Sequence, residues 1–106
     1  MDDKLYNVLN WPRIEAMVYS EEDQPYQILG PHRVAGGVLI QAFLPTVVKA
    51  WVLVHTNKRL YPMEKVDESG FFSVLMPGRQ YPEYSYVIEY KKKKKGEILD
   101  PYCVVP

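Results

Sequence analysis

The sequence predicts an all-β domain, an antiparallel β-sandwich of the immunoglobulin-like kind preceded by a short N-terminal helix. Two patterns support this fold class. From Tyr26 onward apolar side chains recur with a period of two, and Gly- and Pro-containing turn signals separate the runs at short intervals. The nine tyrosines also favour strands, and 106 residues leave room for one domain with one core.

The helix is expected to begin at Asn10-Trp11-Pro12, because proline suits the first helical turn, where its missing N–H would have no partner. Its apolar stripe has the spacing i, i+3, i+4 and consists of Ile14, Met17 and Val18. Carboxylates at positions 21–23 should end it, because the helix dipole disfavours them there. Leu5, Val8 and Leu9 indicate an earlier helical turn. We therefore expect a helical lead-in at residues 1–24 and a β-sandwich at residues 25–106, within one domain.

Six strands follow from the alternation of side chains and the turn signals. They are expected at residues 38–44, 48–54, 59–66, 71–76, 84–90 and 96–99, with a turn at Ser69-Gly70 and a stop at Pro77-Gly78. In the second strand the inward side chains should be Val48, Ala50, Val52 and Val54, which turns Lys49 and Trp51 outward. In the fifth, Tyr86 and Tyr90 are expected in the core.

The charges of the chain are balanced, with 13 basic and 13 acidic residues. No net field therefore points to a nucleic acid or a membrane as partner. The single cysteine, Cys103, excludes an internal disulfide, and no apolar run is long enough to cross a bilayer. The N-terminal segment Met1-Asp2-Asp3-Lys4 has a net acidic charge where a signal peptide would be basic. We expect a cytoplasmic protein.

No pattern of reactive residues suggests an active site. The histidines His32 and His55 have no metal ligand at usable spacing, and His32 follows Pro31 in an expected turn. No base is placed beside Cys103 by the sequence, and the carboxylates cluster in turns, where solvation accounts for them. Gly36-Gly37 lacks the Lys-Ser/Thr ending of a phosphate loop. We predict no catalytic residue, no metal site and no cofactor.

Five consecutive lysines, from Lys91 to Lys95, form the most conspicuous run in the chain. They stand where the strand before them must turn back, so a solvated hairpin tip is the favoured interpretation. Lysines at such a tip also discourage edge-to-edge pairing of sheets. The alternative is a site for a polyanion, although no aromatic residue is interleaved in the run as single-stranded nucleic acid would require.

Aromatic side chains are the remaining candidates for binding. Trp51 alternates out of phase with the core residues of its strand, so it should point outward. It could stack on a sugar or be covered by a neighbouring domain, and the domain contact is favoured because one Trp without a partner ring is a weak sugar signal. Tyr61, Tyr81 and Tyr84 are further candidates that we expect to be exposed.

Several short segments keep a specific order along the chain. They are Tyr26-Gln27-Ile28-Leu29-Gly30-Pro31-His32, the run from Gly37 through Phe43 to Pro45, Ala50-Trp51-Val52-Leu53, Met63-Glu64, Gly70-Phe71-Phe72, Tyr86-Val87-Ile88 and Asp100-Pro101-Tyr102. In this order and spacing they resemble the first N-terminal domain of bacterial glycogen branching enzymes. Gln24-Pro25 departs from the pattern, because the family usually has an acidic residue before this proline. The resemblance gives the motif residues structural roles.

The resemblance implies a parent enzyme that cuts an α-1,4-glucan and rejoins the fragment through an α-1,6 linkage. Its catalytic carboxylates would lie in a (β/α)8 barrel, which alone needs more than twice this length, and a second sandwich would precede that barrel. This chain would be a non-catalytic accessory domain that helps to position glucan and influences the length of the transferred chain. The implied partners are α-glucan, as glycogen or maltooligosaccharide, and the other domains of the parent. A purely structural packing module and an independent polyanion-binding module remain alternatives.

Overall fold

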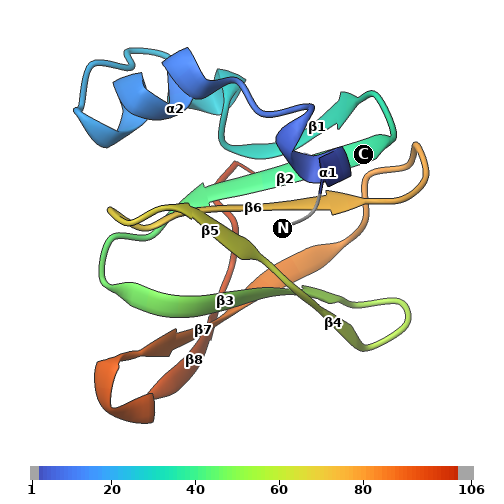
Figure 1. The fold of residues 1–106 in the computed structure, drawn as a ribbon. Coiled ribbons are helices and arrows are strands. Elements are labelled where there is room, and N and C mark those ends of the chain that lie inside the picture. The colour runs from blue at the N-terminus through green and yellow to red at the C-terminus, as the bar shows by residue number, and fades with distance from the viewer. Residues whose placement is uncertain (1–2, 103–106) are drawn as a thin grey trace.

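The computed structural model describes residues 3–102, in which two antiparallel four-stranded sheets pack face to face (Figure 1). The elements are α1 (Asp3–Tyr6), α2 (Trp11–Val18), the 3-10 turns η1 (Pro25–Gln27) and η2 (Lys91–Lys93), and the strands β1 (Gly30–Val34), β2 (Gly37–Phe43), β3 (Val47–Val54), β4 (Arg59–Pro62), β5 (Glu64–Asp67), β6 (Phe71–Met76), β7 (Tyr84–Tyr90) and β8 (Lys95–Ile98). The sheet β1-β2-β6-β5 is called the helix-covered sheet below, and β4-β3-β7-β8 the open sheet. This is the strand order of an immunoglobulin-like sandwich, so the predicted fold class is confirmed.

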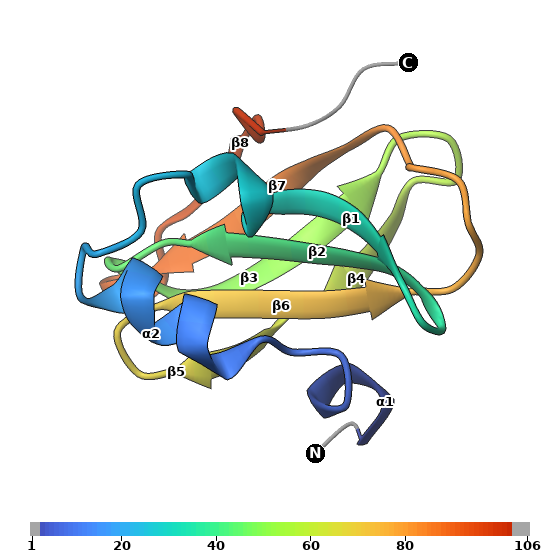
Figure 2. The same ribbon diagram turned by 90° about the horizontal axis from the view of Figure 1, so that it is seen from above.

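Two clusters of buried side chains lie on the two faces of the helix-covered sheet. The main core fills the space between the sheets with alternate residues of β2, β3, β6 and β7, as an aligned sandwich requires. The second core, which consists of Ile14, Ile28, Leu29 and Phe71, lies between this sheet and the helical segments. Figure 2, the view from above, shows these segments over the sheet, with α1 beside β6.

The main helix forms where the sequence predicts it. Asn10 caps α2 by accepting a hydrogen bond from the Arg13 N–H on its side-chain oxygen at 3.3 Å, and Pro12 lies in the first turn. The helix ends at Val18, shortly before the carboxylates at 21–23. The earlier helical turn is present as α1, although Val8 and Leu9 lie beyond its end. The division of the chain after residue 24 stays a prediction.

Two expectations about strands are wrong. The single strand expected at residues 59–66 is two strands, β4 and β5, which belong to different sheets. The chain changes sheets at Met63, whose N–H donates to the Ala50 carbonyl while its side chain enters the main core. The segment around His32 is not a turn but the edge strand β1, which tolerates Pro31 because an edge strand needs fewer ladder hydrogen bonds.

Three expectations about burial also need correction. A bulge between Val47 and Lys49 shifts the register of β3, so Val47 is buried in place of the predicted Val48. Tyr84, expected to be exposed, is only 3% exposed, because it shares the inward face of β7 with Tyr86 and Ile88. Tyr90, expected in the core, is 37% exposed, because β7 there runs out into the lysine turn.

Candidate functional site

The outer side of the open sheet carries an apolar surface, which we call the open face. It consists of Trp51 and Leu53 on β3, Leu60 and Pro62 on β4, and Val87 on β7. The strand register places Pro62, Trp51 and Val87 side by side in one row, with Leu60 beside Leu53 in the next. These residues alternate with the buried side chains of the main core, as the period of a strand requires. The predicted outward position of Trp51 is therefore present in the structure.

Charged side chains border the open face. Lys49 on β3, Glu89 on β7 and Lys95 on β8 are neighbours in one cross-strand row, and the Lys95 ammonium lies 3.9 Å from a Glu89 carboxylate oxygen. Glu97 lies beside Val87 on the adjacent strand. An apolar centre with a charged border is the usual anatomy of a surface that binds another protein surface.

A hydrogen-bonded group on the same outward side of the open sheet, beside Leu53 and Val87, has the residue types of a hydrolase triad. The hydroxyl of the fully buried Ser85 donates to Glu97 Oε2 at 2.6 Å and accepts from His55 Nε2 at 3.1 Å. A nucleophilic serine would instead donate its proton to the histidine, which would act as the base. The Ser85 proton therefore points to Glu97 and not to His55, and the group links the residue after β3 to β7 and β8.

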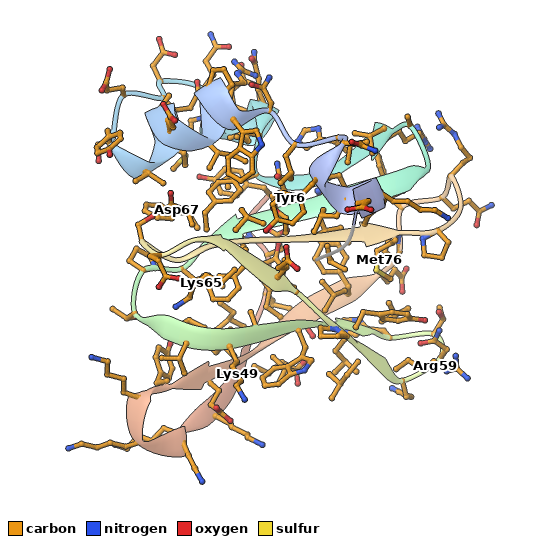
Figure 3. The ribbon with its side chains drawn as sticks, viewed as in Figure 1. Tyr6, Lys49, Arg59, Lys65, Asp67 and Met76 are labelled. Atoms are coloured by element: carbon orange, nitrogen blue, oxygen red, sulfur yellow. The ribbon has the colours of Figure 1, made fainter. Side chains whose placement is uncertain are left out.

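A groove at the edge of the sandwich, called the Trp51 groove, opens beside the open face. Its volume is about 240 Å³, and it is lined by Val48, Lys49, Ala50, Trp51, Pro62, Met63, Lys65 and Phe72. The two lysines come from β3 and β5 (Figure 3), and the Lys65 ammonium lies 5.8 Å from the centre of the Phe72 ring. The groove offers an apolar wall and two cationic donors, so it could hold an apolar side chain or the C–H face of a sugar.

The four aromatic residues proposed from the sequence do not form one platform. Trp51 lies on the open face, whereas Tyr61 packs against the main core and its hydroxyl accepts from Asn57 Nδ2 at 3.1 Å. Tyr81 also packs against the main core, under the Arg33 guanidinium that lies 4.5 Å from its ring centre, so Tyr61 and Tyr81 are partly buried and not exposed as predicted. Tyr84 is fully in the core. Of this set Trp51 alone stands on the open face, so a shared sugar site for all four is not formed.

The segment that leaves β8 is held by a clasp that the sequence did not reveal. The buried Asp100 accepts hydrogen bonds on Oδ2 from the hydroxyls of Tyr84 and Tyr86, the latter at 2.8 Å, and on Oδ1 from the Tyr102 N–H at 2.9 Å. Tyr102 then lies so close to Gly30 that a Cβ on this glycine would be 2.7 Å from the Tyr102 carbonyl oxygen. The spacing of two residues between Tyr84 and Tyr86, which puts both on the same face of β7, is the only sequence signal for this arrangement.

The other motif residues take part in packing or turns. Leu29 and Phe71 belong to the second core, and Phe43 packs against Phe71 with ring centres 6.4 Å apart. His32 Nε2 donates to the Leu29 carbonyl at 3.0 Å, and Gly37 begins β2. Gly70 closes the turn before β6 and lies against Pro45, while Pro101 is exposed. Their assignment as structural residues stays a prediction.

Two ionisable groups have shifted pKa values. The Glu64 carboxylate, through a hydrogen bond, raises the pKa of the Tyr6 hydroxyl, and burial adds to this effect. Hydrogen bonds from the Ser69 hydroxyl and N–H lower the pKa of the Asp67 carboxyl. Tyr6 projects from α1 toward β5 and β6, whereas Asp67 lies at the far end of β5 (Figure 3).

Neither a metal centre nor a membrane-spanning helix is formed by the part of the chain that the structure describes. Within residues 3–102 there is no group of three or more His, Cys, Asp or Glu side chains that could hold a metal ion. No helix in that described part of the chain is long and apolar enough to cross a membrane. Cys103 lies outside the described residues. The five lysines stand at the β7–β8 hairpin, as predicted, and Lys95 already belongs to β8.

Comparisons with known proteins agree with the fold and identify a family. Residues 10–102 match the family model described as alpha-1,4-glucan branching enzyme GlgB, N-terminal domain. The 1,4-alpha-glucan branching enzyme GlgB of Rubrobacter xylanophilus is 31% identical over 93 residues, which are 88% of this chain but only 13% of that enzyme. Two crystal structures of the pullulanase of Paenibacillus barengoltzii share the fold. The apo form and the complex with maltohexaose and alpha-cyclodextrin give TM-scores of 0.58 and 0.59 at 16% identity, over 82% of this chain and 16% of the pullulanase chain. The chain therefore belongs to the family of N-terminal domains of alpha-1,4-glucan branching enzymes.

Proposed function

We propose that this chain is a non-catalytic accessory domain of an enzyme that transfers α-1,4-glucan segments and forms α-1,6 branch points. The observation that carries this proposal is the family match over residues 10–102. The matched relative is far longer than the domain, which corresponds to 13% of it, so the transfer chemistry would reside in the rest of the polypeptide. The direction of the Ser85 hydrogen bonds supports the absence of a nucleophile in this part. From the sequence features we also infer a cytoplasmic location.

The domain's contribution, on this proposal, is to help position glucan and to influence the length of the transferred chain. The test compares the parent enzyme with a form that lacks the domain, by debranching the products and measuring their chain lengths. We expect both forms to make branches, with a changed distribution of chain lengths in the truncated form. Identical distributions would contradict the positioning role, and a parent without any branching activity would contradict the proposed function as a whole.

A second candidate is a packing element with no sugar site of its own. It is favoured by the separation of Trp51, Tyr61 and Tyr81, and by the absence of an acceptor side chain among the residues that line the Trp51 groove. Titration of this chain with maltoheptaose, followed by amide chemical shifts, separates the two candidates. Shifts at Trp51, Lys49 and Lys65 at millimolar sugar would establish direct contact with glucan. Unchanged shifts there would favour the packing element.

A further inference from the structure

We infer that the open face docks on a neighbouring domain of the same polypeptide, with Trp51 at the centre of the contact. This inference rests on the proposed function for the existence of that polypeptide. It adds which side of the sandwich is covered and which residues carry the contact.

The first observation is the amount of apolar surface left uncovered. A sheet with one face in solvent normally alternates apolar and polar side chains, and the polar ones point outward. On the open sheet five neighbouring outward positions are apolar instead, with the polar but buried Ser85 beside Leu53, and Leu60 is 52% exposed. The apolar surface is contiguous, and contiguous apolar surface with a polar border marks a binding surface more often than scattered exposed residues do.

The second observation is that the face is held rigid before anything binds it. The buried Ser85 hydroxyl on β7 joins His55, the residue directly after β3, to Glu97 on β8, so side chains as well as the backbone ladder link these segments of the open sheet. A preorganised surface loses less conformational entropy on binding. Tryptophan is also the residue type that most often carries the binding energy at the centre of such contacts.

The identity of the partner follows from where the chain leaves the sandwich. β8 is an edge strand of the open sheet, and Leu99, directly after it, is 76% exposed. Leu99 lies between the end of β8 and Asp100, which clasps the exit segment, so an exposed apolar side chain stands where the chain leaves the open sheet. In the matched relative most of the polypeptide lies outside the segment that corresponds to this chain. A domain tethered at this exit would meet the open face at high effective concentration.

The row of charged side chains at the border of the open face predicts the charge pattern of the partner surface. Lys49, Glu89 and Lys95 alternate in sign across three strands, so the facing surface should carry charges in the opposite order. A pocket for the indole of Trp51 should lie beside them. The docked state would still allow the domain to act on glucan indirectly, by fixing the positions of the other domains.

The experiment measures how fast a single thiol reacts with a maleimide in this chain and in the full-length parent. Native cysteines, including Cys103, are replaced by serine, and one cysteine is introduced by Leu60→Cys on the open face. The matched control is Glu15→Cys, at an exposed position of α2 on the other side of the molecule. We expect Leu60→Cys to react at least tenfold more slowly in the parent and Glu15→Cys to react equally in both.

A second variant tests whether Trp51 carries the contact. Trp51→Glu should restore fast labelling of Leu60→Cys in the parent, and Trp51→Phe should not. The isolated chain should keep its circular dichroism spectrum in both variants, because the side chain lies outside the main core. Protection that survives Trp51→Glu would overturn the assignment.

The remaining outcomes distinguish this inference from the proposed function. An active branching enzyme in which Leu60→Cys reacts freely overturns the docking and leaves the proposed function standing. A parent with no branching activity overturns the proposed function, whatever the labelling rates. Slow, concentration-dependent labelling in the isolated chain, together with a dimer in size-exclusion chromatography, would identify a second copy as the occupant and would also overturn the inference.

Discussion

The two outer faces of this sandwich differ in what covers them. On the helix-covered sheet, Phe71 is fully buried under the helical lead-in, together with Ile14 from α2. Polar groups of that sheet are also paired: Ser73 Oγ donates to Gln41 Oε1, and Gln41 Nε2 donates to the Ile28 carbonyl, each at 2.9 Å. On the open sheet the corresponding apolar side chains remain partly exposed. One face is completed by this chain itself, and the other lacks a cover among the described residues.

This difference separates stability from binding. Full burial of a side chain such as Ile14 or Phe71 contributes about 1.5–3 kcal/mol to folding. Trp51, Leu53 and Val87 are already partly exposed in the folded chain, so they contribute less to its stability. Their remaining apolar area is available for contact with another surface. Substitutions on the two faces should therefore give opposite patterns in unfolding and in docking experiments.

The largest effect is expected for Ile14→Ala. It leaves a cavity in the second core, between α2 and the sheet, and should lower the free energy of unfolding by about 2–5 kcal/mol. Leu53→Ala on the open face is the matched control and should cost less than about 1.5 kcal/mol, because that side chain is only partly buried. Urea unfolding followed by circular dichroism measures both. Equal losses of unfolding free energy would show that both outer faces contribute alike to stability, and would contradict the difference between them.

The next effect concerns the clasp at the exit. Asp100→Ala deprives the Tyr84 and Tyr86 hydroxyls and the Tyr102 N–H of a buried charged acceptor. The loss should be about 2–3 kcal/mol, because hydrogen bonds to charged groups are the stronger ones and the donors stay buried. Asp23→Ala, at an exposed position, is the control. Thermal unfolding checks this, and a melting temperature unchanged from wild type would argue against the clasp.

A smaller effect is expected for the buried hydroxyl beside Leu53 on the open sheet. Ser85→Ala removes the link between His55 and Glu97 and should cost about 1 kcal/mol. It should also weaken docking if the rigidity of the face matters, which Leu60→Cys labelling in the parent would report. The combination with Glu97→Gln provides a double-mutant cycle. Strictly additive losses in that cycle would contradict a shared hydrogen-bonded group.

The elements that depend on local pattern were predictable from the sequence. Glycine and proline turn signals bracket the runs that form β2 and β6, alternation identifies β3 and β7, and the Asn10 cap with Pro12 identifies the start of α2. The strand β1 is not predictable from the sequence, because Gly30 and Pro31 interrupt the strand pattern. Both residues are nevertheless tolerated at a sheet edge. The change of sheet at Met63, between β4 and β5, is not predictable either. No local signal distinguishes one long strand from two strands that belong to different sheets.

The candidate site was predictable only in part. The alternation of side chains in β3 correctly predicts that Trp51 points outward. Its neighbours on the open face come from β4 and β7, and the pairing register of these strands cannot be predicted from the sequence. The exposure predicted for Tyr84 is wrong because Tyr84 lies two residues before Tyr86 and therefore shares the inward face of β7 with it. Its partner Asp100 lies 16 residues further along the chain, a separation that only the fold can close.

The smallest effect tests how α1 is fastened to the helix-covered sheet. Tyr6 faces Glu64, and this carboxylate raises the pKa of the Tyr6 hydroxyl above its ordinary 10.0, chiefly through a hydrogen bond. A raised pKa in the folded state means that the contribution to stability is complete below the ordinary pKa and is lost as the pH rises through the folded-state pKa. The difference in unfolding free energy between wild type and Tyr6→Phe should therefore be constant below about pH 9 and shrink above about pH 10. Asp67 should show the opposite pH dependence of stability, because Ser69 lowers the pKa of its carboxyl below the ordinary 3.8. The contribution of Asp67 to the free energy of unfolding is therefore lost as the pH falls, and Asp67→Asn should remove this dependence at acidic pH. Urea unfolding across the pH range measures both. If the Tyr6→Phe difference did not change with pH, the contact with Glu64 would not be what fastens α1, and the cover on this face would depend on apolar packing alone.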